Sequence, residues 1–110
     1  WEAVRAAITP ATRMIIVNTP HNPSGAMLAA ADMQTLSDLL AGTDIYLLAD
    51  EVYEHIIYDS ARHESALRWP ALRERAFVIS SFGKTYHCTG WKLGYAIAPP
   101  ALTVEFRKVH

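Results

Sequence analysis

The chain has 110 residues, of which 51% are hydrophobic and 19% are charged, and its formal net charge is −1. This composition is typical of one globular domain or less and excludes a collagen-like or disordered chain. The near balance of charges gives no electrostatic reason to expect a nucleic acid or an anionic membrane as partner. The single cysteine, Cys88, excludes an internal disulfide and favours a cytoplasmic location, and no apolar run approaches the ~20 residues that span a bilayer.

The first predicted elements alternate between strand and helix. Residues 13–18 form a short apolar run, typical of a strand buried on both faces of a parallel sheet, and turn-forming residues follow it. Residues 30–40 have apolar side chains at helical spacing, an acidic residue in the first turn and a glycine just past the end. Residues 45–49 predict a second buried strand. Strand, helix and strand together predict a right-handed βαβ unit, and therefore an α/β fold.

Two further strands are predicted over residues 76–80 and 93–98. Only about a dozen residues separate them, and this connection is rich in glycine and lacks helical periodicity. Parallel neighbours need a crossover of a dozen or more residues, which is usually helical. We therefore expect the strand over 93–98 to run antiparallel to the others, and Pro99-Pro100 to end it before a final helix begins.

Polar segments follow three of these strands, at the points where the strands end. In open α/β sheets, ligands bind outside the carboxyl ends of the strands. If the first three strands are parallel neighbours, four side chains with useful chemistry converge on one edge of the sheet. These are Asn22, Asp50, Tyr53 and Lys84.

A nucleotide-binding site is the competing interpretation, because Gly83-Lys84-Thr85 resembles the end of a phosphate-binding loop. That loop requires a glycine five positions before the Gly-Lys pair, and Val78 occupies the position. The helix that should follow the lysine is interrupted at Thr89-Gly90, and the acidic strand precedes the lysine loop instead of following it. These three departures argue against a nucleotide site.

The converging groups suit a cofactor that has an aldehyde, a phenolic oxygen, a ring nitrogen and a phosphate. Lys84 can form a Schiff base with the aldehyde, and burial with neighbouring charge is the usual way to free a lysine amine for this reaction. Asp50 can keep the ring nitrogen protonated through a charge-assisted hydrogen bond. Asn22 and the Tyr53 hydroxyl can donate to the phenolic oxygen, while Ser81 and Lys92 can bind the phosphate.

Four motifs in this order and spacing resemble those of the class I/II aminotransferases, which have the type I pyridoxal-phosphate fold. The resemblance covers essentially the whole chain. The matched motifs are Asn22-Pro23-x-Gly25, Asp50-x-x-Tyr53, Ser81-x-x-Lys84 and a basic residue, Lys92, eight positions after the lysine.

The resemblance implies pyridoxal 5'-phosphate as cofactor and a part of the three-layer αβα large domain as fold. It makes Lys84 the Schiff-base lysine and the base of the 1,3-proton transfer. The remaining cofactor ligands are then Asn22, Asp50, Tyr53, Ser81 and Lys92. Many relatives have arginine at the position of Lys92, and the family's Asn22-Pro23 bond is cis. No metal site is expected.

Within the family, the run from Ser81 to Lys92 is most similar to methionine aminotransferases of the kynurenine-aminotransferase group. This similarity implies methionine or aromatic amino acids as donors, a 2-oxo acid as acceptor and a homodimer. Two alternatives stay open: a cysteine-conjugate β-lyase of the same fold, and an aminotransferase-like sensor domain of a transcription regulator.

Other conspicuous residues have ordinary structural interpretations. The five histidines lack metal-ligand spacing, and we expect His21 and His87 to be structural or solvent-facing. Glu51 is assigned no catalytic role, and Trp91 is expected to pack within the fold.

Both termini look truncated, since the chain begins without methionine and ends within a predicted helix. We therefore expect residues 1–110 to be the central part of the cofactor-binding large domain. The family's phosphate loop, its ring-stacking aromatic residue and its carboxylate-binding arginine would lie outside this segment. A four-stranded slice of such a sheet is expected to be marginally stable alone.

Overall fold

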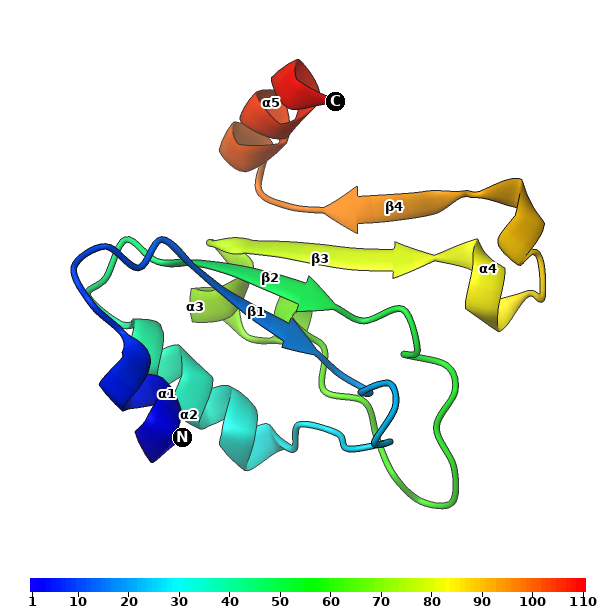
Figure 1. Cartoon of the computed structure of the whole chain (residues 1–110), viewed down its shortest axis with the longest axis horizontal. Coiled ribbons are helices and arrows are strands. Elements are labelled where there is room, and N and C mark those ends of the chain that lie inside the picture. Colours follow the sequence, from blue (N-terminus) through cyan, green and yellow to red (C-terminus); the bar gives the residue numbers. More distant parts are fainter.

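The computed structural model describes residues 1–110, and its four strands form one sheet with helices around it (Figure 1). None of its helices combines the length and the apolar character that a bilayer crossing requires. In chain order the elements are α1 (Glu2–Ala7), β1 (Met14–Asn18), α2 (Ala30–Leu40), β2 (Tyr46–Asp50), the 3₁₀ helix η1 (Ala66–Arg68), α3 (Pro70–Arg73), β3 (Ala76–Ser81), α4 (Phe82–Thr85), the 3₁₀ helix η2 (Thr89–Trp91), β4 (Gly94–Ile97) and α5 (Pro100–Val109).

The sheet has the strand order β1-β2-β3-β4, so strands that follow one another in sequence are neighbours in space. β1, β2 and β3 are parallel, and β4 runs antiparallel to β3. In Figure 1 the first three arrowheads accordingly point one way and that of β4 points back. The predicted α/β class, the helix over 30–40 and the reversed last strand are confirmed, with strand ends displaced by one residue.

The short elements α1, α3, α4, η1 and η2 were not predicted. Helices of three to six residues span less than two turns, so they leave no measurable periodicity in the sequence. α3 does carry one local signal, since Pro70 stands at its first position, where the missing N–H costs nothing.

The core lies between the sheet and α2. Side chains alternate across each strand, so Leu47 and Ala49 of β2 and Val78 of β3 face this side. They meet the apolar stripe of α2, including Leu36, in a cluster of ten buried residues. Each large side chain buried in this way contributes about 1.5–3 kcal/mol relative to exposure. α2 is therefore held by its packing on the sheet.

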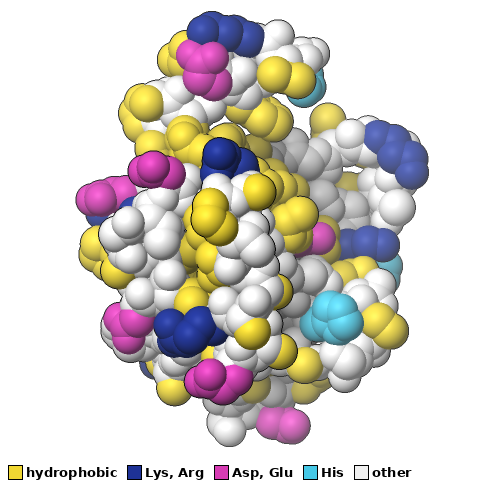
Figure 2. Space-filling model, turned by 60° about the vertical axis from the view of Figure 1, so that its left-hand side comes forward, with side chains coloured by type: hydrophobic (Ala, Val, Ile, Leu, Met, Phe, Trp, Pro, Cys, Tyr) yellow, Lys and Arg dark blue, Asp and Glu magenta, His cyan; other side chains and the backbone are white.

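The opposite face of the sheet is also apolar. Ile16, Leu48 and Phe77 occupy one row across β1, β2 and β3. Phe106 of α5 packs against Phe77 with ring centroids 6.1 Å apart, so α5 adds a helix on this side. Ile16 is nevertheless 68% exposed. Figure 2 shows hydrophobic side chains gathered on the surface below α5, the helix at the top of the view.

The N-terminus of α2 is capped by Asp32 in its first turn. Its carboxylate accepts hydrogen bonds from the Trp1 indole (2.8 Å) and the Ala29 backbone N–H (2.9 Å). The Trp1 hydrogen bond first, and then the Ala29 N–H, lower the pKa of Asp32. Asp32 therefore fixes both the start of α2 and the position of Trp1, the residue that precedes α1.

The C-terminus of α2 and the turn into β2 depend on Arg75, which directly precedes β3. Its Nη1 donates to the carbonyl oxygens of Leu40 (3.0 Å), Thr43 (2.7 Å) and Ile45 (3.3 Å). These carbonyls belong to the end of the helix and the following turn, where backbone acceptors lack helical partners. One guanidinium thus joins α2, the turn and the start of β2 to β3.

Replacing Arg75 by methionine is expected to destabilise the whole protein by about 2 kcal/mol, because it leaves partly buried carbonyls without a charged donor. The lower urea midpoint of unfolding measures this loss. Arg73→Met is the matched control: Arg73 is exposed, and the control should change stability by less than ~0.5 kcal/mol. Equal effects of the two substitutions would contradict the prediction.

Candidate functional site

The carboxyl ends of β1, β2 and β3 lie at the same edge of the sheet (Figure 1). Asn18 and Asp50 are direct partners in the register of β1 and β2, and Asp50 pairs with Ile79 of β3. The backbone continues this pairing beyond the strands, since the Thr19 N–H donates to the Asp50 carbonyl. The predicted common edge is therefore present, and the segments after all three strands start from it.

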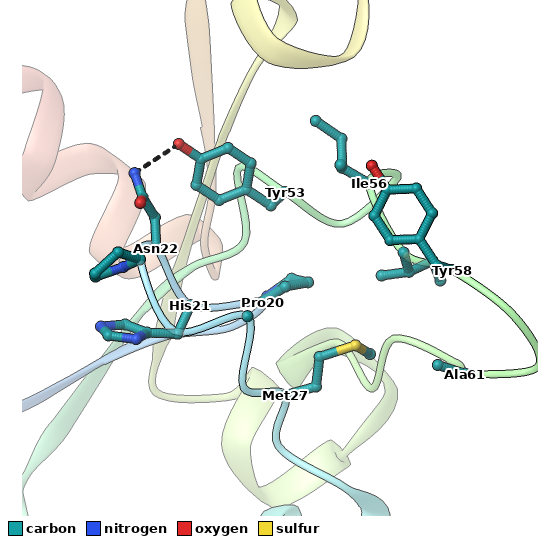
Figure 3. A pocket seen from close by; sticks show the side chains of 11 residues that line it. Pro20, His21, Asn22, Met27, Tyr53, Ile56, Tyr58 and Ala61 are labelled. Carbon is teal, nitrogen blue, oxygen red and sulfur yellow. Dashed lines mark hydrogen bonds between the residues drawn. The ribbon is translucent and has the colours of Figure 1, made fainter.

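Asn22 and Tyr53 meet at this edge although 31 positions separate them. The Asn22 side-chain Nδ2 donates to the Tyr53 hydroxyl at 3.1 Å (Figure 3). The Asn22–Pro23 peptide bond is cis, as expected from the sequence, and Thr19–Pro20 is cis as well. Two of the predicted cofactor ligands are thus in direct contact.

Asn18, which the sequence analysis did not single out, holds this loop. Its side-chain oxygen accepts from the Asn22 backbone N–H (3.1 Å), and its Nδ2 donates to the Asp50 carbonyl (3.1 Å). A single amide therefore bridges the loop after β1 to the end of β2. Its position could have indicated this role from the sequence, since Asn18 is an asparagine at the end of a predicted strand and directly before a turn.

A cavity of about 490 Å³ opens beside Asn22 and Tyr53. Figure 3 shows their polar ends turned to each other at one side, with Met27 and Tyr58 lying farther along the wall. His21 lies in the same wall, is exposed and shares a 2.7 Å hydrogen bond with the Ser24 hydroxyl. Its contacts are those of a loop-forming residue.

The Lys84 loop is closed on itself by hydrogen bonds. The Phe82 backbone N–H donates to the Leu93 carbonyl (3.3 Å), and the Thr89 hydroxyl donates to the Gly83 carbonyl (3.1 Å). A Cβ on Gly83 would lie 3.1 Å from the Thr89 Cα, so glycine permits this close approach. The segment that leaves β3 therefore returns directly to the start of β4.

Closure of this loop brings Ser81, Lys84 and Lys92 to the wall of one cavity of about 320 Å³. Lys92 has a left-handed backbone (φ 54°), a conformation that costs a non-glycine residue about 1 kcal/mol. The surrounding loop holds it there. The side chains of Lys84, Lys92 and Ser81 thus line one small cavity.

Two expectations about this region are corrected. Lys84 is exposed, so the residues of this chain do not provide the burial expected around its amine. Trp91 is 74% exposed and does not pack within the fold. Both residues belong to the loop that leaves the sheet, where few other segments of residues 1–110 lie near enough to cover them.

Asp50 stands apart from both cavities. It ends β2, is half-buried, and its Oδ1 accepts from the Val52 backbone N–H at 3.2 Å. It lies between the two groups in the sheet, since β2 is flanked by β1 and β3. The structure therefore brings Asn22 and Tyr53 into contact, gathers Ser81, Lys84 and Lys92 around one cavity, and places the carboxylate on the strand between these two groups.

Glu51, for which no catalytic role was expected, is a structural anchor. Its side chain is 1% exposed, and its carboxylate accepts from the Ala66 backbone N–H (2.8 Å) and lies 2.8 Å from His63 Nε2. It thereby holds the start of η1 below the sheet edge. Sequence reasoning could not find this role, because an acidic pair at a strand end looks the same whether buried or solvated.

The donor set has the chemistry of the predicted cofactor. Lys84 supplies an amine, Lys92 and Ser81 supply a cation and a hydroxyl for a phosphate, and Asp50 supplies an anion for a ring nitrogen. The Asn22 amide and the Tyr53 phenol supply donors for a phenolic oxygen. Each group that pyridoxal phosphate requires of these strand ends is thus available.

Comparison with known proteins gives a consistent result. The family model "Aminotransferase class I and II" matches residues 1–110. The chain is 50% identical to a methionine aminotransferase of Escherichia coli over 110 residues, and 41% identical over 106 residues to a probable N-succinyldiaminopimelate aminotransferase of Mycobacterium tuberculosis. These matches cover 100% and 96% of this chain, but only 28% and 27% of the relatives.

Solved structures agree with the fold. The crystal structure of YbdL from E. coli, described as having a methionine aminotransferase function, superposes with a TM-score of 0.96 at 50% identity, over 100% of this chain and 29% of that one. An aspartate aminotransferase from Thermus thermophilus superposes with a TM-score of 0.81 at 39% identity, over 89% and 25%. Because the family model matches every residue, the chain belongs to the class I and II aminotransferases.

Proposed function

We propose that the whole protein that carries this chain is a pyridoxal-phosphate-dependent aminotransferase. The observation that carries the proposal is the shared cavity of Ser81, Lys84 and Lys92 at the strand edge of a class I and II aminotransferase chain. An amine beside a phosphate-binding cation and hydroxyl is what a cofactor with both an aldehyde and a phosphate requires.

In this proposal each predicted ligand holds one part of the cofactor. Lys84 binds the aldehyde carbon through its Nζ, while Ser81 and Lys92 bind the phosphate. Asp50 accepts a hydrogen bond from the ring N–H, and Asn22 and Tyr53 donate to the phenolic oxygen. When bound, pyridoxal phosphate supplies a ring that stabilises negative charge on the carbon that bears the amino group.

Lys84 has a second task in the reaction. With the cofactor bound, the free Nζ of Lys84 would move a proton between the substrate carbon that bears the amino group and the cofactor carbon that was the aldehyde. Asn22 can also donate to the substrate carboxylate, which would fix the substrate on the side of the lysine.

We propose methionine or an aromatic amino acid as donor and a 2-oxo acid as acceptor. The E. coli relative at 50% identity is named a methionine aminotransferase, and a relative from Thermococcus litoralis at 40% identity is named an aromatic-amino-acid aminotransferase. Relatives named aspartate aminotransferases also match, at 38–45% identity. The higher identity to the methionine enzyme supports this order of preference.

The remaining parts of the proposal concern the whole protein. The chain spans 28% of the length of its E. coli relative, and we place it in the centre of the cofactor-binding large domain. The family resemblance supports a homodimer, which light scattering on the whole protein would test. A cytoplasmic location stays a prediction, supported by the free thiol of Cys88.

The first test replaces Lys84 by alanine in the whole protein. The parent protein loaded with pyridoxal phosphate should retain the cofactor covalently after borohydride reduction and denaturation, and Lys84→Ala should not, because no amine remains to bind the aldehyde carbon. Lys108→Ala is the matched control, since Lys108 is an exposed lysine of α5 that pairs with Glu105. Covalent retention of the cofactor in Lys84→Ala would refute the assignment.

A second test concerns Lys92. Lys92→Ala should keep the covalent absorbance band but raise the dissociation constant for the cofactor about tenfold, because one charge-assisted contact to the phosphate is lost. Lys92→Arg should bind at least as tightly as the parent, since a guanidinium can contact two phosphate oxygens. Fluorescence titration of the cofactor-free protein measures both constants. An unchanged constant in Lys92→Ala would remove this residue from the phosphate site.

The third test identifies the reaction. Methionine added to the loaded protein should convert the bound cofactor to its amine form and release one equivalent of the 2-oxo acid, and a second 2-oxo acid should reverse the change. Aspartate should react at least tenfold more slowly, expressed as kcat/KM. Pyruvate release from a cysteine conjugate without consumption of an acceptor would instead indicate the β-lyase activity.

A further inference from the structure

The residue after Tyr53 makes an unusual set of contacts. Glu54 extends its carboxylate over the β3–β4 strand pair, where Oε1 accepts from the Ser80 hydroxyl (2.8 Å) and the Tyr95 hydroxyl (3.0 Å). Ser80 and Tyr95 are direct partners in the register of the two strands. A single carboxylate oxygen therefore receives one hydroxyl donor from each strand.

A metal ion is the first alternative for this carboxylate, since Glu51, Glu54 and His63 bring three ligand atoms within 4.8 Å of one another. Each acid already has protein donors, however. Glu51 is hydrogen-bonded to His63 and to the Ala66 N–H, and Glu54 receives two hydroxyls. The carboxylates of Glu51 and Glu54 are therefore already engaged in hydrogen bonds within the protein.

These hydrogen bonds fix both ends of the turn that carries Tyr53. The Glu54 backbone N–H donates to the Glu51 carbonyl at 2.8 Å, and the Ile56 N–H donates to the Tyr53 carbonyl at 2.8 Å. Glu51 ties one end of the turn to η1, and Glu54 ties the other to β3 and β4. Tyr53 lies between the two anchored carboxylates.

The contacts of Glu54 lead directly to the lysine side of the site. Ser81 follows Ser80, and β3 continues without a break into α4, which carries Lys84. β4 begins at Gly94, two residues after Lys92, and Tyr95 is its second residue. The Glu54 carboxylate is thus the hydrogen-bonded link between the Tyr53 turn and the two strand ends that bear the lysines.

The energy of this link is appreciable. Hydrogen bonds to an ionised acceptor are about twice as strong as neutral ones, and the Glu54 side chain is only 22% exposed. Ser80 is 3% exposed, so loss of the carboxylate would leave its hydroxyl without this partner in a buried place. The carboxylate oxygen therefore determines where the turn sits on the strand pair.

We propose that Glu54 is a positioning residue, which sets the Tyr53 hydroxyl relative to the cofactor through Ser80 and Tyr95. The proposal rests on the proposed function, because Tyr53 needs a cofactor oxygen to act on. When the Tyr53 hydroxyl donates a hydrogen bond to the phenolic oxygen of the cofactor, it stabilises the negative charge on that oxygen. This favours loss of the proton that the oxygen shares with the Lys84 nitrogen. Displacement of Tyr53 should therefore raise the pH at which that proton leaves.

The test is a pH titration of the absorbance of the cofactor-loaded whole protein, with Tyr53→Phe as reference. Glu54→Ala should move the midpoint upward, in the direction of Tyr53→Phe, by about one pH unit, the equivalent of one charge-assisted hydrogen bond. Glu54→Gln keeps an acceptor oxygen at the same reach and should move it by less than half as much. Glu105→Ala, which removes an exposed carboxylate of α5, should leave it unchanged.

Ser80→Ala and Tyr95→Phe each remove one donor and leave Glu54 in place, so each should give a smaller upward shift, even if Glu54→Ala does not fold. The inference would be overturned if only Tyr53→Phe shifted the midpoint of the pH titration, while the folded Glu54, Ser80 and Tyr95 variants kept the midpoint of the parent protein. That result would leave the proposed function intact. Covalent retention of the cofactor in Lys84→Ala after borohydride reduction would overturn the proposed function itself.

Discussion

The site depends on the parallel direction of three neighbouring strands. Because β1, β2 and β3 run the same way, the segments that follow them all begin at one edge of the sheet. Asn22, Tyr53 and Lys84 are far apart in sequence, and this shared direction is what brings their loops to one side of the fold. The core cluster between α2 and the sheet keeps the strands in register and so keeps the edge in place.

A shared edge does not by itself give the precision of a binding site. That precision comes from polar side chains whose partners lie on a neighbouring segment. Asn18 joins the loop after β1 to β2, and Glu51 and Glu54 join the turn after β2 to η1 and to the last two strands. Each of these side chains stands next to, or a few residues before, a predicted cofactor ligand. The anchors are thus placed where a small displacement would matter most.

The sequence predicted what depends on local pattern and missed what depends on burial. Short apolar runs, turn residues and the non-helical connection before residue 93 predicted the four strands and the reversed direction of β4. The position of both residues after neighbouring strands also predicted that Asn22 and Tyr53 would lie at one edge, where they are in contact. Trp91 was expected to pack within the fold but is exposed within residues 1–110, because the coverage of a loop depends on segments distant in sequence. For the same reason nothing in the sequence separated the buried Glu51 from an ordinary exposed acid.

The loop between β3 and β4 shows how one length constraint serves both fold and chemistry. A connection of a dozen residues without a long helix does not suit a parallel crossover, and the chain turns back along β3. That return requires the loop to close, and the Phe82–Leu93 hydrogen bond with the close approach of Gly83 to Thr89 closes it. Closure in turn brings Lys92 to the cavity wall that Lys84 and Ser81 share. The spacing between the two lysines therefore follows from the reversal of the strand as much as from the needs of a phosphate, and an insertion in this loop would disturb both at once.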